Sequence, residues 1–304
     1  MRLVKLKPYG YCEGVAFALS QLDKITTKHR GHKIYLIGWL IHNEMIMRAL
    51  AKKHVIVLDD QAVSRLNLLK KIPAKKNAVV VLSAHGSEKN TLSYAKNNFG
   101  YCYDLTCKYI HENIKIINEL LDKKNIIIFL GKKNHPETKA ILSYSPKIIY
   151  IESIKDLSKI KFGATKKYCL LNQTTMPQYA ISDSLKDIKY PNLHWINTTC
   201  HATALRHANI LKLKKETGLI VVGDVRSNNT QQLVALGKKQ NLKVYCGNDI
   251  KSFHHFKFIK EAYAITSGTS TSSMIVDEIE KDLNYQYDVR TPKLNKLSKL
   301  KESN

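Results

Sequence analysis

The chain has 304 residues, of which 44% are hydrophobic and 24% are charged, a composition typical of a folded globular protein rather than a disordered one. The formal net charge is +24, but the lysines are scattered through nearly every segment, which indicates a compositional bias and not a nucleic-acid-binding stripe. No apolar run reaches the length of a membrane span and no signal peptide is evident, so we expect a cytoplasmic protein with no nucleic-acid or membrane partner.

Short apolar runs bounded by polar turns alternate with amphipathic segments along the whole chain. In chain order the apolar runs are KIYLIGWLIHNE, HVIVLDD and VVVLSAHGS, then NIIIFLGKKNHPE, KIIYIES and YCLLNQTT, then GLIVVGDVRSNN, LKVYCGN and AYAITSGTS. In each set of three runs, a helix pattern follows the last run. In the first two sets this helix pattern leads to a further strand that ends at a cysteine. This alternation predicts an α/β protein with mostly parallel sheets.

Three cysteines repeat at a nearly constant interval. Cys12, Cys107 and Cys200 each follow a strand-like run and precede a helix-like run, and their separations are 95 and 93 residues. The interval predicts three pseudo-equivalent α/β units, with the first residues of the chain supplying the last strand of the third unit. The expected units are residues 13–107, residues 108–199, and residues 200–290 with 1–12, followed by a basic tail at 291–304.

The three repeated cysteines are expected to converge, because ligands of parallel sheets bind beyond the carboxyl ends of the strands. Structural zinc prefers four protein ligands, whereas three thiolates suit a [4Fe–4S] cluster that leaves one iron open to a substrate. The other three cysteines, Cys102, Cys169 and Cys246, do not recur in register and are expected to be structural.

Polar residues at the remaining strand ends predict an anion site with a proton donor. Imidazole, hydroxyl and amide groups suit a phosphate or diphosphate, and no P-loop or dinucleotide fingerprint accompanies them. Glu137 is the best candidate for a positioned acid, with Thr174 as a hydroxyl relay. The candidate anion ligands are His42, His85, His135, Ser227, Asn229 and Ser270.

Nine short motifs occur in an order that resembles one known family. They are YCEGV, IHNE, SAHGS, DLTC, NHPET, NQTT, TCHATALRHA, SNN and TSGTS, and the resemblance runs from about residue 1 to 280. On these motifs the chain is similar to the LytB/IspH family of 4-hydroxy-3-methylbut-2-enyl diphosphate reductases, which act in the non-mevalonate isoprenoid pathway.

The resemblance implies a trefoil of three α/β units around a [4Fe–4S] cluster held by Cys12, Cys107 and Cys200. It implies reductive dehydroxylation of 4-hydroxy-3-methylbut-2-enyl diphosphate to isopentenyl and dimethylallyl diphosphates, with electrons from a ferredoxin- or flavodoxin-like donor. Glu137 would deliver protons and Thr174 would help to place the substrate hydroxyl. The implied diphosphate ligands are His42, His85, His135, Ser227, Asn228, Asn229 and Ser270.

The chain departs from the usual family pattern at several positions. Glu13 replaces a small residue after the first cysteine, Lys108 replaces a proline after the second, and Asn228 replaces a serine. None of these changes removes an implied cluster ligand or the acid. Two other classes remain as alternatives: a non-redox hydratase-like or iron-sensing cluster protein, which needs no proton donor, and a basic RNA-associated protein with salt-dependent affinity.

Overall fold

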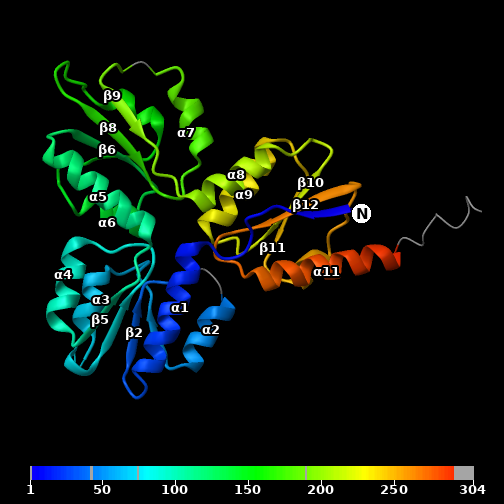
Figure 1. The fold of residues 1–304 in the computed structure, drawn as a ribbon, viewed down its shortest axis with the longest axis horizontal. Helices are drawn as coiled ribbons and strands as arrows, with labels where there is room; N and C mark the ends of the chain where they lie inside the picture. Colours follow the sequence, from blue (N-terminus) through cyan, green and yellow to red (C-terminus); the bar gives the residue numbers. More distant parts are fainter. Residues whose placement is uncertain (1, 42–43, 74, 189, 291–304) are drawn as a thin grey trace, which may run out of the picture. The chain divides into compact units, whose positions relative to one another are not determined.

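The computed structural model describes residues 2–41, 44–73, 75–188 and 190–290. These residues form three four-stranded sheets in which neighbouring strands run parallel (Figure 1). They divide into two compact units, one formed by residues 12–204 and the other by the residues up to 11 together with those from 205 onward. Within the described ranges, no helix combines the length and apolar character needed to cross a membrane.

The first sheet lies in the unit of residues 12–204 and has helices on both faces. Its strands are β2 (Ile34–Ile37), β3 (Val55–Leu58), β4 (Val79–Leu82) and β5 (Tyr101–Asp104), in the order β3-β2-β4-β5. Its helices are α1 (Glu13–Lys28), α2 (Glu44–Lys52), α3 (Arg65–Lys71) and α4 (Lys89–Asn98), with a short 3-10 helix, η1 (Lys75–Asn77). Figure 1 shows α1 and α2 on one face and α3 and α4 on the other.

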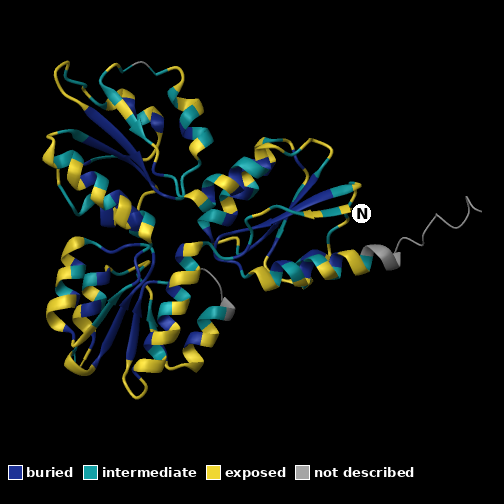
Figure 2. Ribbon diagram, in the orientation of Figure 1, coloured by how far each residue is buried: buried dark blue, intermediate teal, exposed yellow. Residues whose placement is uncertain are grey.

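Alternation of side chains along the strands explains why both faces of this sheet are covered. Ile34 and Leu36 of β2 pack with α1 and α2, whereas Tyr35 and Ile37 pack with α3 and α4. Successive strand residues point to opposite faces, so a continuous apolar run such as IYLI has two faces to bury. Burying each such aliphatic side chain stabilises the fold by about 1.5–3 kcal/mol, and Figure 2 shows the strands of the sheets largely buried.

The second sheet belongs to the same unit and repeats the strand order. Its strands are β6 (Ile126–Leu130), β7 (Ile149–Ile151), β8 (Tyr168–Asn172) and β9 (Leu193–Ile196), in the order β7-β6-β8-β9. Its helices are α5 (Lys108–Asp122), α6 (Pro136–Leu142) and α7 (Gln178–Leu185), with the 3-10 helix η2 (Ile154–Lys159). Ile128 and Leu130 face the core beside η2 and α7, whereas Ile127 and Phe129 face α5 and α6.

The third sheet lies in the other unit and takes one strand from the start of the chain. Its strands are β10 (Gly218–Val222), β11 (Val244–Gly247), β12 (Ala262–Ser267) and β1 (Arg2–Lys5), in the order β1-β12-β10-β11. Its helices are α8 (His201–Leu211), which begins in the first unit, α9 (Asn228–Lys239), α10 (Ile250–His254) and α11 (Ser273–Arg290). Lys5 pairs with Ile265, as expected for an N-terminal strand that completes this sheet.

All three sheets have the same topology, which confirms the three-unit α/β fold predicted from the repeat. In each sheet the first strand along the chain has the second strand on one side and the third strand on the other, and the fourth strand lies beyond the third. In the third sheet β10 is counted as the first strand and β1 as the fourth. This order places a topological switch point between the first and third strands, where ligands of such sheets bind. The unit boundaries given above stay a prediction, and the tail at 291–304 lies outside the described residues.

Candidate functional site

Each repeated cysteine lies directly before a helix, in the unit of residues 12–204. Cys12 precedes α1, Cys107 precedes α5 and Cys200 precedes α8. The carbonyl oxygen of each accepts a hydrogen bond from the first turn of its helix, donated by the backbone N–H of Ala16, His111 and Ala204 respectively. A helix N-terminus carries a partial positive charge, which favours a thiolate at that position.

The sulfur atoms of Cys12 and Cys107 both lie close to Gly14. A Cβ atom on Gly14 would lie 2.6 Å from Sγ of Cys107 and 4.0 Å from Sγ of Cys12, so only glycine leaves room there. Burial raises the pKa of the Cys107 thiol to about 12, and nearby Cys12 and Cys200 contribute to the rise. Negative charge on Cys12 or Cys200 therefore disfavours ionisation of Cys107, as expected for thiols that lie close together. A bound cation would stabilise the three thiolates.

A turn and one backbone contact hold the loop of Cys107. The carboxylate of Asp104 accepts hydrogen bonds from the backbone N–H and the hydroxyl of Thr106, at 3.0 and 2.5 Å. The backbone N–H of Cys107 then donates to the carbonyl of Ala84, at 3.0 Å. The motif DLTC thus forms a side-chain-stabilised turn that is tied to the loop after β4.

A buried asparagine holds the loop of Cys200. The backbone N–H of Asn172 donates to the Thr198 hydroxyl at 2.9 Å, and its side-chain amide donates to the Thr199 hydroxyl at 3.0 Å. Its Oδ1 accepts the indole N–H of Trp195 at 3.1 Å. The motifs NQTT and INTTC therefore interlock, because the polar groups of a buried asparagine require partners.

Glu137 is a buried carboxyl group whose two oxygens both contact Thr174. Oε1 accepts the backbone N–H of Thr174 and Oε2 accepts its hydroxyl, each at 2.7 Å. Only 1% of Glu137 is exposed, and burial raises its pKa to about 7 although both hydrogen bonds from Thr174 oppose the rise. A carboxyl group with this pKa exchanges its proton near neutral pH, as a general acid requires.

Thr174 also connects the acid to the cysteines. Its carbonyl oxygen accepts the backbone N–H of Cys200 at 2.8 Å, in the way that Ala84 accepts the N–H of Cys107. The charge of Glu137 contributes to the raised pKa of both Cys107 and Cys200, although burial is the main cause for each. The acid, its hydroxyl partner and these thiols therefore form one cluster of groups.

Two of the predicted histidines meet beside this cluster. The rings of His85 and His135 are 5.9 Å apart in an edge-to-face arrangement, and both line a pocket of about 130 Å³. His135 is also the N-cap of α6, since its Nδ1 accepts the backbone N–H of Glu137 at 3.2 Å. In a neutral ring this leaves the proton on Nε2, which is then a donor for an anion.

The other described residues of the predicted anion site lie in the second unit. Ser227 and Ser270 are both buried, and their hydroxyl oxygens are 3.3 Å apart. Asn228 and Asn229 are the first two residues of α9, for which Ser227 is the N-cap. This combination of hydroxyl groups and a helix N-terminus suits a negatively charged group.

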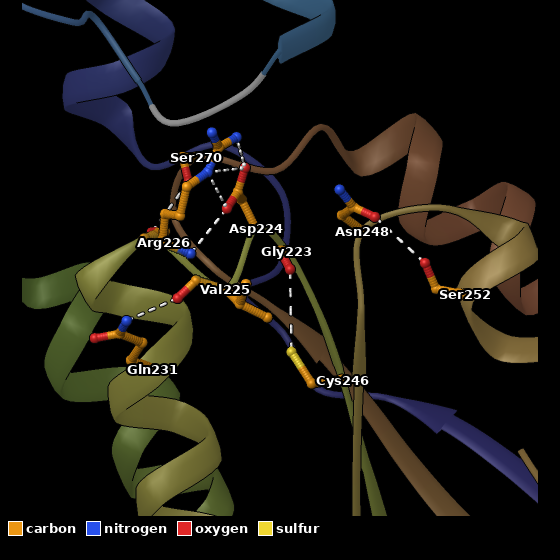
Figure 3. A network of polar contacts seen from close by, with 10 residues as sticks. Gly223, Asp224, Val225, Arg226, Gln231, Cys246, Asn248, Ser252 and Ser270 are labelled. Atoms are coloured by element: carbon orange, nitrogen blue, oxygen red, sulfur yellow. Dashed lines mark hydrogen bonds and ion pairs between the residues drawn. The ribbon is translucent and has the colours of Figure 1, made fainter.

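An ion pair orders the turn that leads to Ser227. The guanidinium group of Arg226 contacts both carboxylate oxygens of Asp224, at 2.6 to 3.2 Å. The backbone N–H of Ser227 donates to the carbonyl of Asp224 at 3.0 Å. Figure 3 shows this pair next to Ser270.

The other predicted residues fall into two groups. His42 lies outside the described residues. Cys102, Cys169 and Cys246 lie within β5, β8 and β11, away from the helix starts that carry the three repeated cysteines. All six cysteines are free thiols.

One residue of the site region carried no signal in the sequence. Arg65 is buried beneath the loop that contains His85 and donates hydrogen bonds to that loop. Nothing in SRLNLLKK distinguishes Arg65 from an exposed helical arginine, because its partners are distant in sequence.

Comparison with known proteins assigns the chain to a family. The profile of the family described as LytB protein matches residues 3–284. A 4-hydroxy-3-methylbut-2-enyl diphosphate reductase of Malacoplasma penetrans is 34% identical, with 92% of this chain and 96% of that protein covered. The corresponding protein of Geobacillus kaustophilus is 31% identical, with 96% of this chain and 92% of that protein covered.

A solved structure supports the same fold. The E-1-hydroxy-2-methyl-but-2-enyl-4-diphosphate reductase from Plasmodium falciparum superposes with a TM-score of 0.80 at 24% identity, covering 97% of this chain and 89% of that chain. The match to the family profile over nearly the whole sequence, together with the two relatives that are 34% and 31% identical, shows that the chain belongs to the LytB family.

Proposed function

We propose that the chain is an iron–sulfur oxidoreductase that converts 4-hydroxy-3-methylbut-2-enyl diphosphate into isopentenyl and dimethylallyl diphosphates. The observation that carries this proposal is the buried pair of Glu137 and Thr174 beside Cys107 and Cys200. A reductive dehydroxylation consumes protons where the C–O bond breaks, and this pair places a proton donor next to the thiols. Relatives that cover almost the whole chain carry the same enzyme name.

We propose that Cys12, Cys107 and Cys200 hold a [4Fe–4S] cluster. The donor set fits, because it supplies three soft thiolate ligands and Gly14 leaves no side chain between two of the sulfurs. Among the described residues, no three histidine, cysteine or acidic side chains are grouped to hold a metal ion, and a cluster of several irons can bridge more widely spaced thiols. Such a cluster, when bound, supplies electrons and a Lewis-acidic iron.

Glu137 and Thr174 supply the proton. Burial raises the pKa of Glu137 to about 7, so this carboxyl group can hold a proton near neutral pH and pass it to the Thr174 hydroxyl. The hydroxyl accepts this proton while it donates its own, so it can serve as a relay to a substrate oxygen or carbon. The burial of Glu137 keeps bulk water from equilibrating this proton directly.

We propose that the imidazole, hydroxyl and amide groups predicted from the sequence bind the diphosphate. The Nε2–H group of His135, the ring of His85 and the hydroxyl groups of Ser227 and Ser270 can donate hydrogen bonds to its oxygens, and charge-assisted bonds of this kind are the strong ones. Asn228 and Asn229 begin α9 and can donate from the backbone N–H groups of this helix N-terminus and from their two side-chain amides. His42 lies outside the described residues and is assigned to this set from the sequence, by its place after a predicted strand and by the family resemblance.

The reaction also needs an electron donor and a cellular compartment. We propose a ferredoxin- or flavodoxin-like protein as the electron donor, because a [4Fe–4S] cluster is reduced one electron at a time and such proteins deliver single electrons. We also propose a cytoplasmic location, which agrees with six free thiols, since reduced cysteines are the rule there.

The test is anaerobic purification with iron and sulfide counting, followed by turnover of the hydroxylated diphosphate with a reduced viologen dye. We expect about four irons per chain and formation of both products. Glu137→Gln should keep the iron and lose turnover by about 100-fold or more, whereas Glu119→Gln, a change at an exposed residue of α5, should be neutral.

Cysteine variants separate the ligands from the structural thiols. Cys200→Ser should lose iron, whereas Cys246→Ser in β11 should retain it. A protein that holds four irons and never turns over would favour the sensing or hydratase-like alternative, and a protein that binds no iron would exclude both.

A further inference from the structure

A single buried arginine joins the loops that follow three neighbouring strands of the first sheet. Its hydrogen-bond partners are Asp60 after β3 and Ser83, Gly86 and Ser87 after β4. Nε of Arg65 donates to Oδ2 of Asp60 at 2.6 Å. Nη1 donates to the carbonyl of Gly86 at 2.5 Å and to the hydroxyl of Ser87 at 2.9 Å, and Nη2 donates to the hydroxyl of Ser83 at 2.8 Å.

The loop after β2 packs directly on the same guanidinium group. Gly38 has a φ of +76°, and a Cβ atom at this position would collide with Nη2 of Arg65 and lie 2.9 Å from the Asp60 carboxylate. The backbone N–H of Gly38 donates to the carbonyl of Leu58 at 2.9 Å. Arg65 is 6% exposed, so these contacts are shielded from water and are stronger than they would be at the surface.

The segment held by Arg65 is the one that carries His85. Ser83, Gly86 and Ser87 bracket His85 on both sides, so three hydrogen bonds fix the backbone from which the imidazole projects. On the opposite side, a Cβ atom on Gly86 would lie 3.2 Å from Cβ of Ala140, so the loop passes close to α6. Arg65, Asp60 and His85 all line the same pocket.

We propose that Arg65 is a positioning residue that fixes the His85 imidazole for binding the diphosphate of the substrate. This inference rests on the proposed function, because it takes His85 as a diphosphate ligand. Four of the five N–H groups of Arg65 donate to Asp60 and to the loop of His85, so the guanidinium is engaged mainly in holding that loop. A planar guanidinium directs five N–H groups in fixed directions, and a lysine ammonium cannot reproduce this fork.

The first test compares Arg65→Met and Arg65→Lys with Lys70→Met, which removes the same charge from an exposed position of α3. The holoenzyme variants are assayed for KM and kcat with a reduced viologen dye and for affinity toward inorganic diphosphate by calorimetry. We expect Arg65→Met to raise KM and weaken diphosphate binding by about 10- to 100-fold. Iron content should stay at the wild-type level, Arg65→Lys should not restore binding, and Lys70→Met should be neutral.

A double-mutant cycle with His85→Ala gives the decisive readout. If Arg65 acts through His85, the loss of diphosphate affinity caused by His85→Ala is much smaller in the Arg65→Met background than in the wild type. Full additivity of the two losses overturns the proposal, as does unchanged affinity in Arg65→Met. If Arg65→Met does not fold, Ser83→Ala removes one loop contact with Arg65 in place, and the same cycle is then measured with that variant.

The two proposals fail in different ways. A wild-type holoenzyme that neither binds inorganic diphosphate nor turns over the substrate contradicts the proposed function. An active wild-type enzyme in which Arg65 and His85 contribute independently contradicts only the positioning role.

Discussion

Glu13 and Lys108 form an ion pair in which the carboxylate oxygen and the ammonium nitrogen are 2.5 Å apart. Glu13 directly follows Cys12 and Lys108 directly follows Cys107, so the pair joins the first turns of α1 and α5. The family resemblance implies a small residue and a proline at these two positions. The two departures contact each other, and this explains how the chain accommodates a charge beside each of two proposed cluster ligands.

Charge reversal tests whether this pair steadies the two cysteine loops. Glu13→Lys and Lys108→Glu should each place like charges next to each other and shorten the lifetime of the cluster absorbance in air by roughly two- to five-fold. The double reversal should restore the wild-type lifetime, because it rebuilds the pair with opposite polarity. Since both side chains are exposed, the difference should shrink in high salt. Equal lifetimes in all four proteins at low salt would show that the pair has no influence on the cluster.

Gly14→Ala should impair cluster assembly. The added methyl group would lie 2.6 Å from Sγ of Cys107, so the thiol or the helix has to move. We expect less than half of the wild-type iron after reconstitution, whereas Gly163→Ala should bind iron normally. A Cβ atom on Gly163 has its nearest neighbour at 3.4 Å, an ordinary contact. Full iron content in Gly14→Ala would mean that the cysteine loop adapts easily.

The raised pKa of Glu137 predicts how stability depends on pH. Because the folded-state pKa of about 7 lies above the ordinary 4.5, the folded protein binds this proton more tightly than the unfolded chain does. The carboxyl group therefore lowers stability as the pH rises from about 4.5 to 7, and the full cost is present above pH 7. A shift of this size corresponds to about 3 kcal/mol.

Urea unfolding of the apoprotein at several pH values measures this cost. Glu137→Gln has no group that ionises, so its stability relative to the wild type should increase between pH 5 and pH 8. A constant difference between the two proteins over that range would show that Glu137 keeps an ordinary pKa.

Thr174→Val and Thr174→Ser separate the hydroxyl from the shape of the side chain. The Thr174 hydroxyl lowers the pKa of Glu137, so its removal in Thr174→Val should raise that pKa further. The alkaline limb of the pH profile of kcat should then move to higher pH, and kcat should fall by about 100-fold because the relay is lost. Thr174→Ser keeps the hydroxyl and should retain the wild-type profile, and an unshifted limb in Thr174→Val would remove the hydroxyl from the mechanism.

The sequence predicted the features that are encoded locally. Apolar runs predicted strands, and the constant interval between Cys12, Cys107 and Cys200 predicted three similar units, which the three identical sheet topologies confirm. The pairing of β1 with β12 was also predictable, because the third unit otherwise lacked a last strand. These inferences needed only the period of the pattern along the chain.

Features that depend on contacts between distant residues could not be predicted. Arginine is rarely buried, so its residue type alone predicts that Arg65 lies on the surface. Its partners Ser83 and Gly86 lie in the loop after β4, which is distant in the sequence. Glu13 and Lys108 were recognised as departures, but their contact required the arrangement of α1 and α5. The double hydrogen bond from Thr174 to Glu137 likewise involves a backbone N–H, which no side-chain motif specifies.

The pairing of Lys5 with Ile265 has a consequence for synthesis of the protein. A chain that emerges from the ribosome at about 5–20 residues per second keeps β1 without its partner strand for ten seconds or longer. The unit of residues 12–204, which contains all three repeated cysteines, is complete well before β12 appears. The three thiols can therefore come together while the third sheet is still unformed. A nonsense mutation before residue 262 would remove β12 and leave β1 without its partner strand.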